Sequence, residues 1–225
     1  MIEPDAAELR VLGSLIEKQR TTPDAYPLSL NSLRVACNQA TGREPVVDYD
    51  EATIRDAIAR LVRRGWARLA SGPGSRATKY RHLLDEALTL SGPECSLLAV
   101  LMLRGAQTPG ELRVRSERLH HFATLEELDA VLDGLASRRL VIRFERRPGQ
   151  KEARWSLGEG FGYSAAGERD GDGDGEGATF ASLQPAGSVP GDRSSEATLE
   201  SRVAALEREL ESLRGVIEHL RAGER

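Results

Sequence analysis

The stretches LVRRGWARLASGPGSRATKY (residues 61–80) and LASRRLVIRFERRPGQKEARW (residues 135–155) share one layout, and they decide the predicted fold. Each runs from the end of a helix into a short strand, a Pro-Gly turn and a second strand. An aromatic residue follows seven residues after each proline, which gives the pairs Pro73 with Tyr80 and Pro148 with Trp155. The chain is therefore predicted to contain two copies of one folding unit.

Three segments with a helical spacing of apolar residues precede each hairpin. They span about residues 5–19, 29–42 and 50–64 in the first copy, and about 92–104, 109–119 and 125–138 in the second. Capping boxes mark the starts of the second set, at Ser91 with Glu94, Thr108 with Glu111 and Thr124 with Glu127. Three helices followed by a two-stranded hairpin is the winged-helix plan. We therefore predict a mainly helical α+β fold with small β-hairpins, made of two tandem winged-helix domains and a C-terminal coiled-coil helix.

The predicted boundaries are residues 1–86 for the first winged-helix domain, 90–158 for the second, 159–195 for a linker and 196–222 for the coiled coil. The linker is expected to be disordered because it is rich in Gly, Asp and Ser. Apolar residues recur with 4-3 spacing in the last segment, at Leu199, Val203, Leu206, Leu210, Leu213, Ile217 and Leu220. This pattern is compatible with a parallel two-stranded coiled coil and hence with a homodimer. The same stripe could also pair antiparallel or pack on a winged-helix domain.

The third helix of the first copy carries arginines opposite its apolar face. Ile54, Ile58 and Leu61 belong to the face that is expected to be buried. Basic residues of the opposite arc and of the following hairpin are the candidate DNA-binding residues: Arg55, Arg60, Arg63, Arg68, Arg76 and Lys79. Arginine forks can contact phosphates or guanine edges, so this copy is the candidate DNA-facing module. The alternative is a charged face that only contacts solvent.

The corresponding helix of the second copy carries carboxylates instead. Glu126, Asp129 and Asp133 share its outer arc, and phosphates would repel them. These three residues are candidates for a protein contact, with plain solvation as the alternative. The second hairpin is basic again, and it could touch a DNA backbone or serve as a charged edge that discourages strand pairing.

Polar residues cluster around the connection between the second and third helices of the first copy. Tyr26, Asn38, Gln39 and Arg43 could satisfy backbone groups of an irregular loop, which is the favoured interpretation, or form a binding surface. Residues 43–49, with Pro45 and two valines, are expected to be a strand-like link.

Composition excludes several classes of function. The formal net charge is -4, with 24 Lys and Arg against 22 Asp and Glu in residues 1–160, so any case for nucleic-acid binding must be local. The two cysteines, Cys37 and Cys95, have no metal-type spacing and are expected to be reduced core residues. The four histidines do not converge, and no phosphate loop or nucleophile motif occurs. We expect no enzymatic activity, cofactor, metal, signal peptide or membrane span, and a cytoplasmic location.

Long blocks of this sequence resemble the YceH-like family of bacterial proteins of unknown function. The blocks are LIEKQRTTPDAYPLSLNSLRVACNQATGREPV (residues 15–46), LRGAQTPGELRVRSERLHHF (residues 103–122) and the hairpin segments GPGSRATKY and RRPGQKEARW. The resemblance covers about residues 7–157. It implies a tandem winged-helix fold, and it implies no catalytic residue, ligand or partner.

Together these features predict a non-enzymatic DNA-binding regulator or architectural protein that acts as a dimer on double-stranded DNA. The alternative is a protein-interaction scaffold that uses its winged-helix domains without DNA contact. The paired opposite charges of the two third helices are compatible with both.

Overall fold

The structure is a computed structural model that describes residues 3–70, 78–146 and 152–163. These residues belong to one compact unit, residues 1–182, and they form a mainly helical fold with two small antiparallel sheets. The predicted α+β class is confirmed at this level. Arg76, both Pro-Gly turns, most of the predicted linker and the predicted coiled-coil helix lie outside the described residues.

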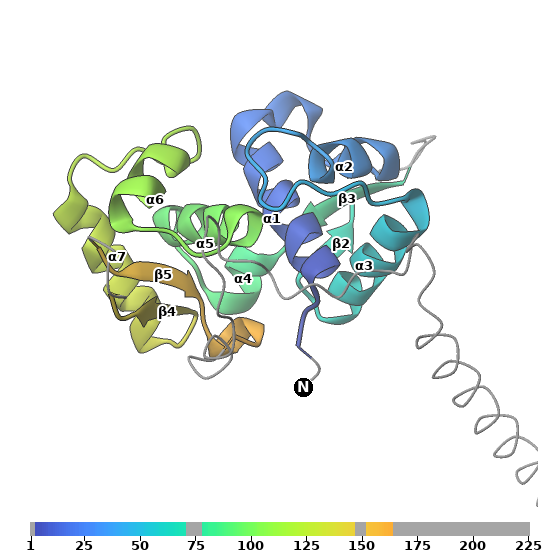
Figure 1. The fold of residues 1–225 in the computed structure, drawn as a ribbon. Coiled ribbons are helices and arrows are strands. Elements are labelled where there is room, and N and C mark those ends of the chain that lie inside the picture. Colours follow the sequence, from blue (N-terminus) through green and yellow to red (C-terminus); the bar gives the residue numbers. More distant parts are fainter. Residues whose placement is uncertain (1–2, 71–77, 147–151, 164–225) are drawn as a thin grey trace, which may run out of the picture. The chain divides into compact units, whose positions relative to one another are not determined.

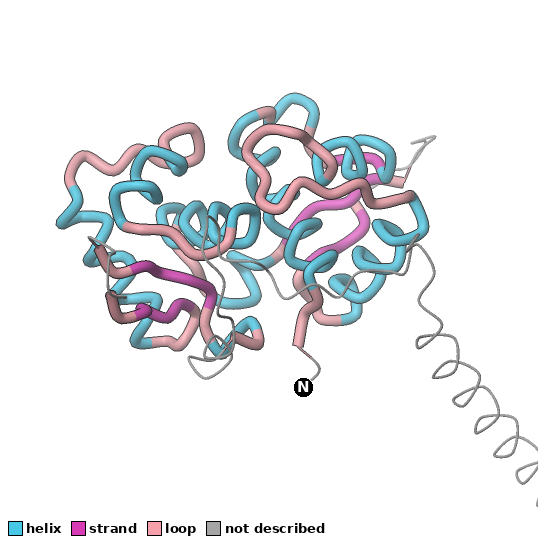
Figure 2. Tube along the Cα trace, in the orientation of Figure 1, coloured by secondary structure: helices cyan, strands magenta, loops and turns pink. Residues whose placement is uncertain are grey.

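Three helices followed by a two-stranded hairpin occur in two successive repeats (Figures 1 and 2). The first repeat contains α1 (Ala6–Thr21), the short helix η1 (Pro23–Ala25), β1 (Leu28–Ser29), α2 (Leu30–Cys37), α3 (Glu51–Arg63), β2 (Ala67–Leu69) and β3 (Lys79–His82). A short helix that the sequence did not predict, α4 (Leu84–Leu88), joins it to the second repeat. The second repeat contains α5 (Gly92–Arg104), α6 (Pro109–Ser116), α7 (Leu125–Ser137), β4 (Val141–Phe144) and β5 (Arg154–Leu157), followed by η2 (Glu159–Phe161).

Side-chain caps fix where the helices begin. The Asp5 carboxylate accepts from the Glu8 N–H while Glu8 accepts from the Asp5 N–H, and Ser91 with Glu94 repeats this capping box at α5. A third box at α6 is also as predicted. At α7 the Thr124 hydroxyl accepts from the Glu127 N–H, as predicted. The Glu127 carboxylate, however, accepts from the N–H of Ala123 and not from that of Thr124, so the box is shifted by one residue.

The sheets show the duplication at the level of register. In the first repeat the strands lie in the order β1-β3-β2, and Leu28 of β1 pairs with Tyr80 of β3. In the second repeat β4 pairs with β5, and an isolated bridge joins Gln107 to Trp155. The two aromatic residues that follow the Pro-Gly turns therefore each pair with the residue two positions before the second helix of their own repeat.

The first helices of the two repeats pack against each other, and Figure 1 shows α1 beside α5. Residues 8–16 of α1 and 95–103 of α5 are all buried. A Cβ atom on Gly13 would lie only 3.0 Å from side-chain atoms of Met102 and Leu103, so glycine permits the close approach. One hydrophobic cluster runs through both repeats as a result.

Three details differ from the sequence predictions. α2 ends at Cys37, and residues 43–49 form no strand. The predicted linker boundary at residue 159 is too early, because η2 follows β5 and Phe161 is 1% exposed. Its ring meets that of Trp66 edge-on at a centroid distance of 5.6 Å. Aromatic burial thus holds this segment against the first repeat.

Candidate nucleic-acid interface

The helix α3 presents one buried and one exposed face, as its sequence pattern predicts. Asp50 caps it by accepting from the Thr53 N–H at 2.8 Å. Ile54, Ile58 and Leu61 are at most 1% exposed, and they anchor the helix on the core. Gly65 ends it with a positive φ of 75°, the left-handed conformation that favours glycine. The outward face of α3 is therefore held rigidly.

Arg60, a predicted DNA-binding residue, is already engaged by carboxylates at the start of α1. Its Nη2 lies 2.6 Å from Asp5 Oδ2, and its Nε lies 3.2 Å from Glu8 Oε2. The neighbouring Arg64 Nε also lies 2.9 Å from Glu8 Oε1. Glu8 is buried, so these arginines supply the charge that its carboxylate needs in the interior. Arg60 thus braces α3 against α1, a role that its helical position alone did not indicate.

Arg55 and Arg63 remain on the outer face of α3. Both are exposed, and Arg55 pairs with Glu51 one turn earlier on the same helix. An exposed i,i+4 pair contributes roughly 0.3–0.5 kcal/mol, so Arg55 can exchange this partner for another anion. Arg63 forms no ion pair with any residue in the described ranges.

The hairpin β2–β3 continues this basic surface. Arg68 is exposed and stands opposite Arg81 across the strand pair, while Arg81 lies 2.9 Å from Glu86. Lys79 is half-buried at the start of β3, opposite Ser29. Of the six predicted DNA-binding residues, Arg55, Arg63 and Arg68 are exposed, Lys79 is half-buried, Arg60 is braced by acids, and Arg76 lies outside the described residues.

The equivalent helix of the second repeat has the opposite character. Glu126, Asp129 and Asp133 are all exposed on α7, and none forms an ion pair with a described residue. Burial, and after it the charge of Asp133, raises the pKa of Asp129. The three candidate protein-contact residues therefore form an exposed acidic surface without ion pairs to described residues.

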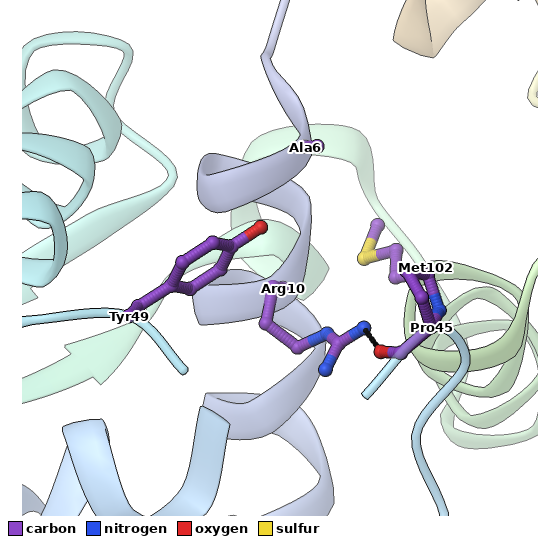
Figure 3. Close-up of a pocket in the computed structure, with 5 residues that line it drawn as sticks. All are labelled: Ala6, Arg10, Pro45, Tyr49 and Met102. Carbon is purple, nitrogen blue, oxygen red and sulfur yellow. Dashed lines mark hydrogen bonds between the residues drawn. The ribbon is translucent and has the colours of Figure 1, made fainter. Parts of the chain in front are cut away.

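Buried arginines hold the loop between α2 and α3. Arg43 has a fully buried side chain that contacts both carboxylate oxygens of Glu17, at 3.1 and 2.6 Å, and the carbonyl of Ala36. Arg10 donates to the carbonyls of Cys37 at 3.1 Å and Pro45 at 2.6 Å; Figure 3 shows the second bond. These contacts support the loop-fixing interpretation of this cluster.

The same cluster lines a small, partly open cavity of about 20 Å³ between Arg10, Pro45, Tyr49 and Met102 (Figure 3). Burial, as the largest cause, lowers the pKa of Arg10, and its Nε has no hydrogen-bond partner among the described residues. The volume suits a single water molecule and no larger ligand. We therefore assign the cavity to loop support.

The other three residues of the predicted polar cluster, two amides and a phenol, also form hydrogen bonds. Asn38 accepts from the Tyr49 N–H at 2.9 Å and donates to the Tyr49 carbonyl at 2.8 Å. The Tyr26 hydroxyl accepts from the His82 N–H at 2.8 Å. Gln39 accepts from Arg43 at 3.1 Å. All four residues of the predicted polar cluster therefore bond within the protein.

The described ranges also contain both cysteines of the chain. Cys37 and Cys95 are buried thiols without a disulfide, and burial raises their pKa values to about 11 and about 12. No group of three or more His, Cys, Asp or Glu residues there has the arrangement of a metal site. Among the same residues, none of the helices combines the length and hydrophobicity of a membrane span.

Comparison with known proteins gives the family. Residues 5–150 match the family described as "Protein of unknown function, DUF480", and this match covers more than half of the chain. The chain belongs to this family. The resemblance to YceH-like proteins that residues 15–46 and 103–122 indicate is thus confirmed.

Bacterial relatives match the same part of the chain. A "UPF0502 protein" of Geotalea daltonii is 51% identical over 151 residues, which cover 66% of this chain and 69% of the relative. A "UPF0502 protein" of Serratia proteamaculans is 45% identical over 160 residues, which cover 68% and 75%. The "UPF0502 protein YceH" of Salmonella schwarzengrund is 46% identical over 160 residues, which cover 68% and 74%. The family description names no activity, so any functional proposal depends on the geometry of this chain.

Proposed function

We propose that this protein binds double-stranded DNA through its first repeat, as a non-enzymatic regulator or architectural protein. Each repeat is interpreted as a winged helix, with α3 as the helix that lies in the groove and β2–β3 as the wing. The order of three helices and a hairpin in both repeats supports this interpretation, together with the strand β1 in the first repeat and the isolated bridge of Gln107 at the corresponding place in the second.

One observation carries the proposal: exposed arginines continue from α3 into the hairpin. Arg55 and Arg63 lie on the outer face of the helix, and Arg68 is exposed on the strand that follows. Guanidinium groups in this arrangement suit phosphates along one edge of a duplex. The interface proposed from the described residues is therefore Arg55, Arg63, Arg68 and Lys79, with Arg60 holding the helix in place.

A salt titration of DNA affinity tests the proposal. We expect the full chain to bind a labelled duplex at low salt, with an affinity that falls steeply as the salt concentration rises. The double variant Arg55→Glu with Arg63→Glu should lose at least tenfold in affinity. The slope of log affinity against log salt should become shallower by about two, because two phosphate contacts are lost.

A charge-matched control isolates the face from the overall charge. Arg118→Glu with Arg139→Glu changes two exposed arginines of the second repeat by the same amount. This control should retain most of the affinity. Equal losses in the two double variants, or no binding at low salt, would contradict the proposal.

We also propose that the protein acts as a dimer through the apolar stripe from Leu199 to Leu220. The stripe lies outside the described residues, so the proposal rests on its 4-3 spacing alone. Sedimentation of the full chain should give twice the monomer mass of 24.5 kDa. The double variant Leu206→Lys with Leu213→Lys should sediment as a monomer.

A protein-interaction scaffold without DNA contact is the second candidate function. The exposed carboxylates of α7 favour it, because they would repel the phosphates of DNA and attract a basic protein surface. This candidate predicts no DNA affinity of the full chain at physiological salt.

A further inference from the structure

The second repeat contains an open groove of about 600 Å³ between α6, α7 and the hairpin β4–β5. Pro109 and Gly110 contribute from the start of α6, Leu125 from the start of α7, and Trp155 from β5. This volume lies within the roughly 300–1,000 Å³ that ligand sites of proteins occupy. The groove is therefore large enough for several side chains of a bound segment.

Two carboxylates of α7 line this groove. Asp129 and Asp133 are one helical turn apart, so they project from the same face of the helix. Neither forms a hydrogen bond or an ion pair with a described residue, and the two charges repel each other. A cation placed between them would relieve this repulsion.

Among the described residues that line it, the groove is acidic. Four of these are acidic, Asp129, Asp133, Glu145 and Glu152, and two are basic, Arg143 and Arg146. Arg143 lies over the ring of Trp155, 6.0 Å from its centroid. The net charge of these described residues therefore repels anions and attracts cations.

Apolar surface lies beside the two carboxylates. Leu125 is 40% exposed although it is a large aliphatic residue, and Pro109 faces the same groove. Arginine and lysine side chains place an aliphatic stem on apolar surface while their charged end reaches a carboxylate. The combination of an acidic pair and apolar surface thus matches a basic side chain with an apolar neighbour.

We propose that this groove binds a segment of a partner protein that carries an arginine or lysine next to apolar residues. The cationic end pairs with Asp129 and Asp133, and the apolar residues contact Leu125 and Pro109. The proposal deepens the second candidate function, since it names the partner chemistry, and it holds whether or not the first repeat binds DNA.

The first repeat cannot form the same site. Its α3 carries Arg55 where α7 has Asp129, and Ala59 where α7 has Asp133, counted from the first residue of each helix. The acidic pair is therefore specific to the second repeat. A basic segment should bind one site in each chain.

Peptide selection on the full chain tests the proposal. A phage-displayed library of 12-residue peptides is panned against the protein, and an enriched peptide is synthesised and titrated. The variant Trp66→Phe leaves Trp155 as the only tryptophan, so its fluorescence reports on the groove. We expect enriched peptides with arginine or lysine beside apolar residues, and a change in Trp155 emission on binding.

Matched substitutions locate the binding site. Asp129→Asn with Asp133→Asn keeps the side-chain shape at two exposed positions, and it should weaken the peptide at least tenfold. Glu117→Gln with Glu44→Gln removes the same charge at two exposed positions outside the groove lining and should change the affinity less than twofold. Thermal unfolding of both double variants checks that the fold is retained.

Two other outcomes would separate a failure of the groove proposal from a failure of the protein-binding function. Enriched peptides without a basic residue, or with equal affinity for both double variants, would overturn the groove proposal but leave a protein-binding function in place. Absence of any enriched peptide would overturn both. DNA affinity, measured separately on the Asn double variant, should stay the same or rise.

Discussion

The helices α3 and α7 occupy the same place in the two repeats, but their outer faces carry opposite charges. They also differ in whether those charged side chains form ion pairs with other elements. On α3, Arg60 is braced by Asp5 and Glu8 of α1, while α7 has Gly134 at the corresponding position. On α7, Asp129 and Asp133 have no such partners among the described residues. The first repeat thus uses one charged residue of its third helix in an internal contact, whereas the acidic pair of the second repeat stays on the surface. Duplication preserved the framework of the fold and let its polar interactions diverge.

The two repeats should differ most in how strongly their stability depends on the arginine that supports the loop between the second and third helices. Arg43→Ala would leave Glu17 without its bidentate partner and remove hydrogen bonds to the loop. We therefore expect it to lower the free energy of unfolding by about 3–5 kcal/mol. In the second repeat, Arg113 supports the loop by donating to the carbonyls of Phe122 at 3.2 Å and Ala123 at 3.0 Å. Arg113→Ala should cost only about 1 kcal/mol. Urea unfolding of the full chain measures both, and similar losses would refute the contrast.

A buried histidine should make the first repeat sensitive to acid. His82 is 1% exposed, and burial lowers its pKa from 6.5 to about 4. The unfolded chain therefore takes up a proton that the folded chain does not, and stability is lost as the pH falls from 6.5 toward 4. The second repeat has Leu157 at this position of its hairpin, opposite Val141.

Replacing His82 with leucine tests this acid sensitivity. We expect His82→Leu to remove roughly 2–3 kcal/mol of the pH-dependent loss, although it leaves Gln19 without a bond of 2.6 Å. Chemical unfolding at a series of pH values gives the slope. His121→Gln, at an exposed position, is the control and should keep the slope of the parent protein. An unchanged slope in His82→Leu would show that other groups cause the acid loss.

The smallest expected difference between the repeats is in the stability of the residue with positive φ that follows the third helix, α3 or α7. Gly65 and Arg139 both have a positive φ, 75° and 58°, but only glycine adopts this conformation without strain. We expect Gly65→Ala to lower the free energy of unfolding by about 1 kcal/mol and Arg139→Gly to raise it by about 0.5–1 kcal/mol, both measured by urea unfolding. Arg139→Ala removes the exposed ion pair with Glu159 but keeps the Cβ atom, so it separates the two effects. A destabilised Arg139→Gly protein would contradict this account.

Local signals made much of this fold predictable. The capping residues Asp5, Ser91 and Thr108 determine helix starts through contacts only three residues long, so the sequence displays both partners together. The same holds for the apolar spacing of α3 and for Gly65 at its end. The duplicated hairpin pattern, with Tyr80 and Trp155, likewise indicated equivalent pairings that the structure has.

Long-range contacts account for the rest. The partners of Arg60 are 52 and 55 residues away in the sequence, so helical position alone indicated an exposed side chain. The groove of the second repeat needs three elements to come together, although its acidic pair was visible in the sequence. Phe161 and Tyr163 could have corrected the linker boundary, because aromatic residues are only 4% of this chain and two of them follow the last strand closely.

The pairing of α1 with α5 has a consequence for how such a chain could arise. Equivalent helices contact each other, which is the form of an isologous interface between two identical subunits. An ancestral protein of one repeat would have buried the same helix by self-association. Fusion of its two copies would then have made that association permanent and freed each half to change its surface independently. A fragment with only one half would expose an apolar helix to water and would be prone to aggregate.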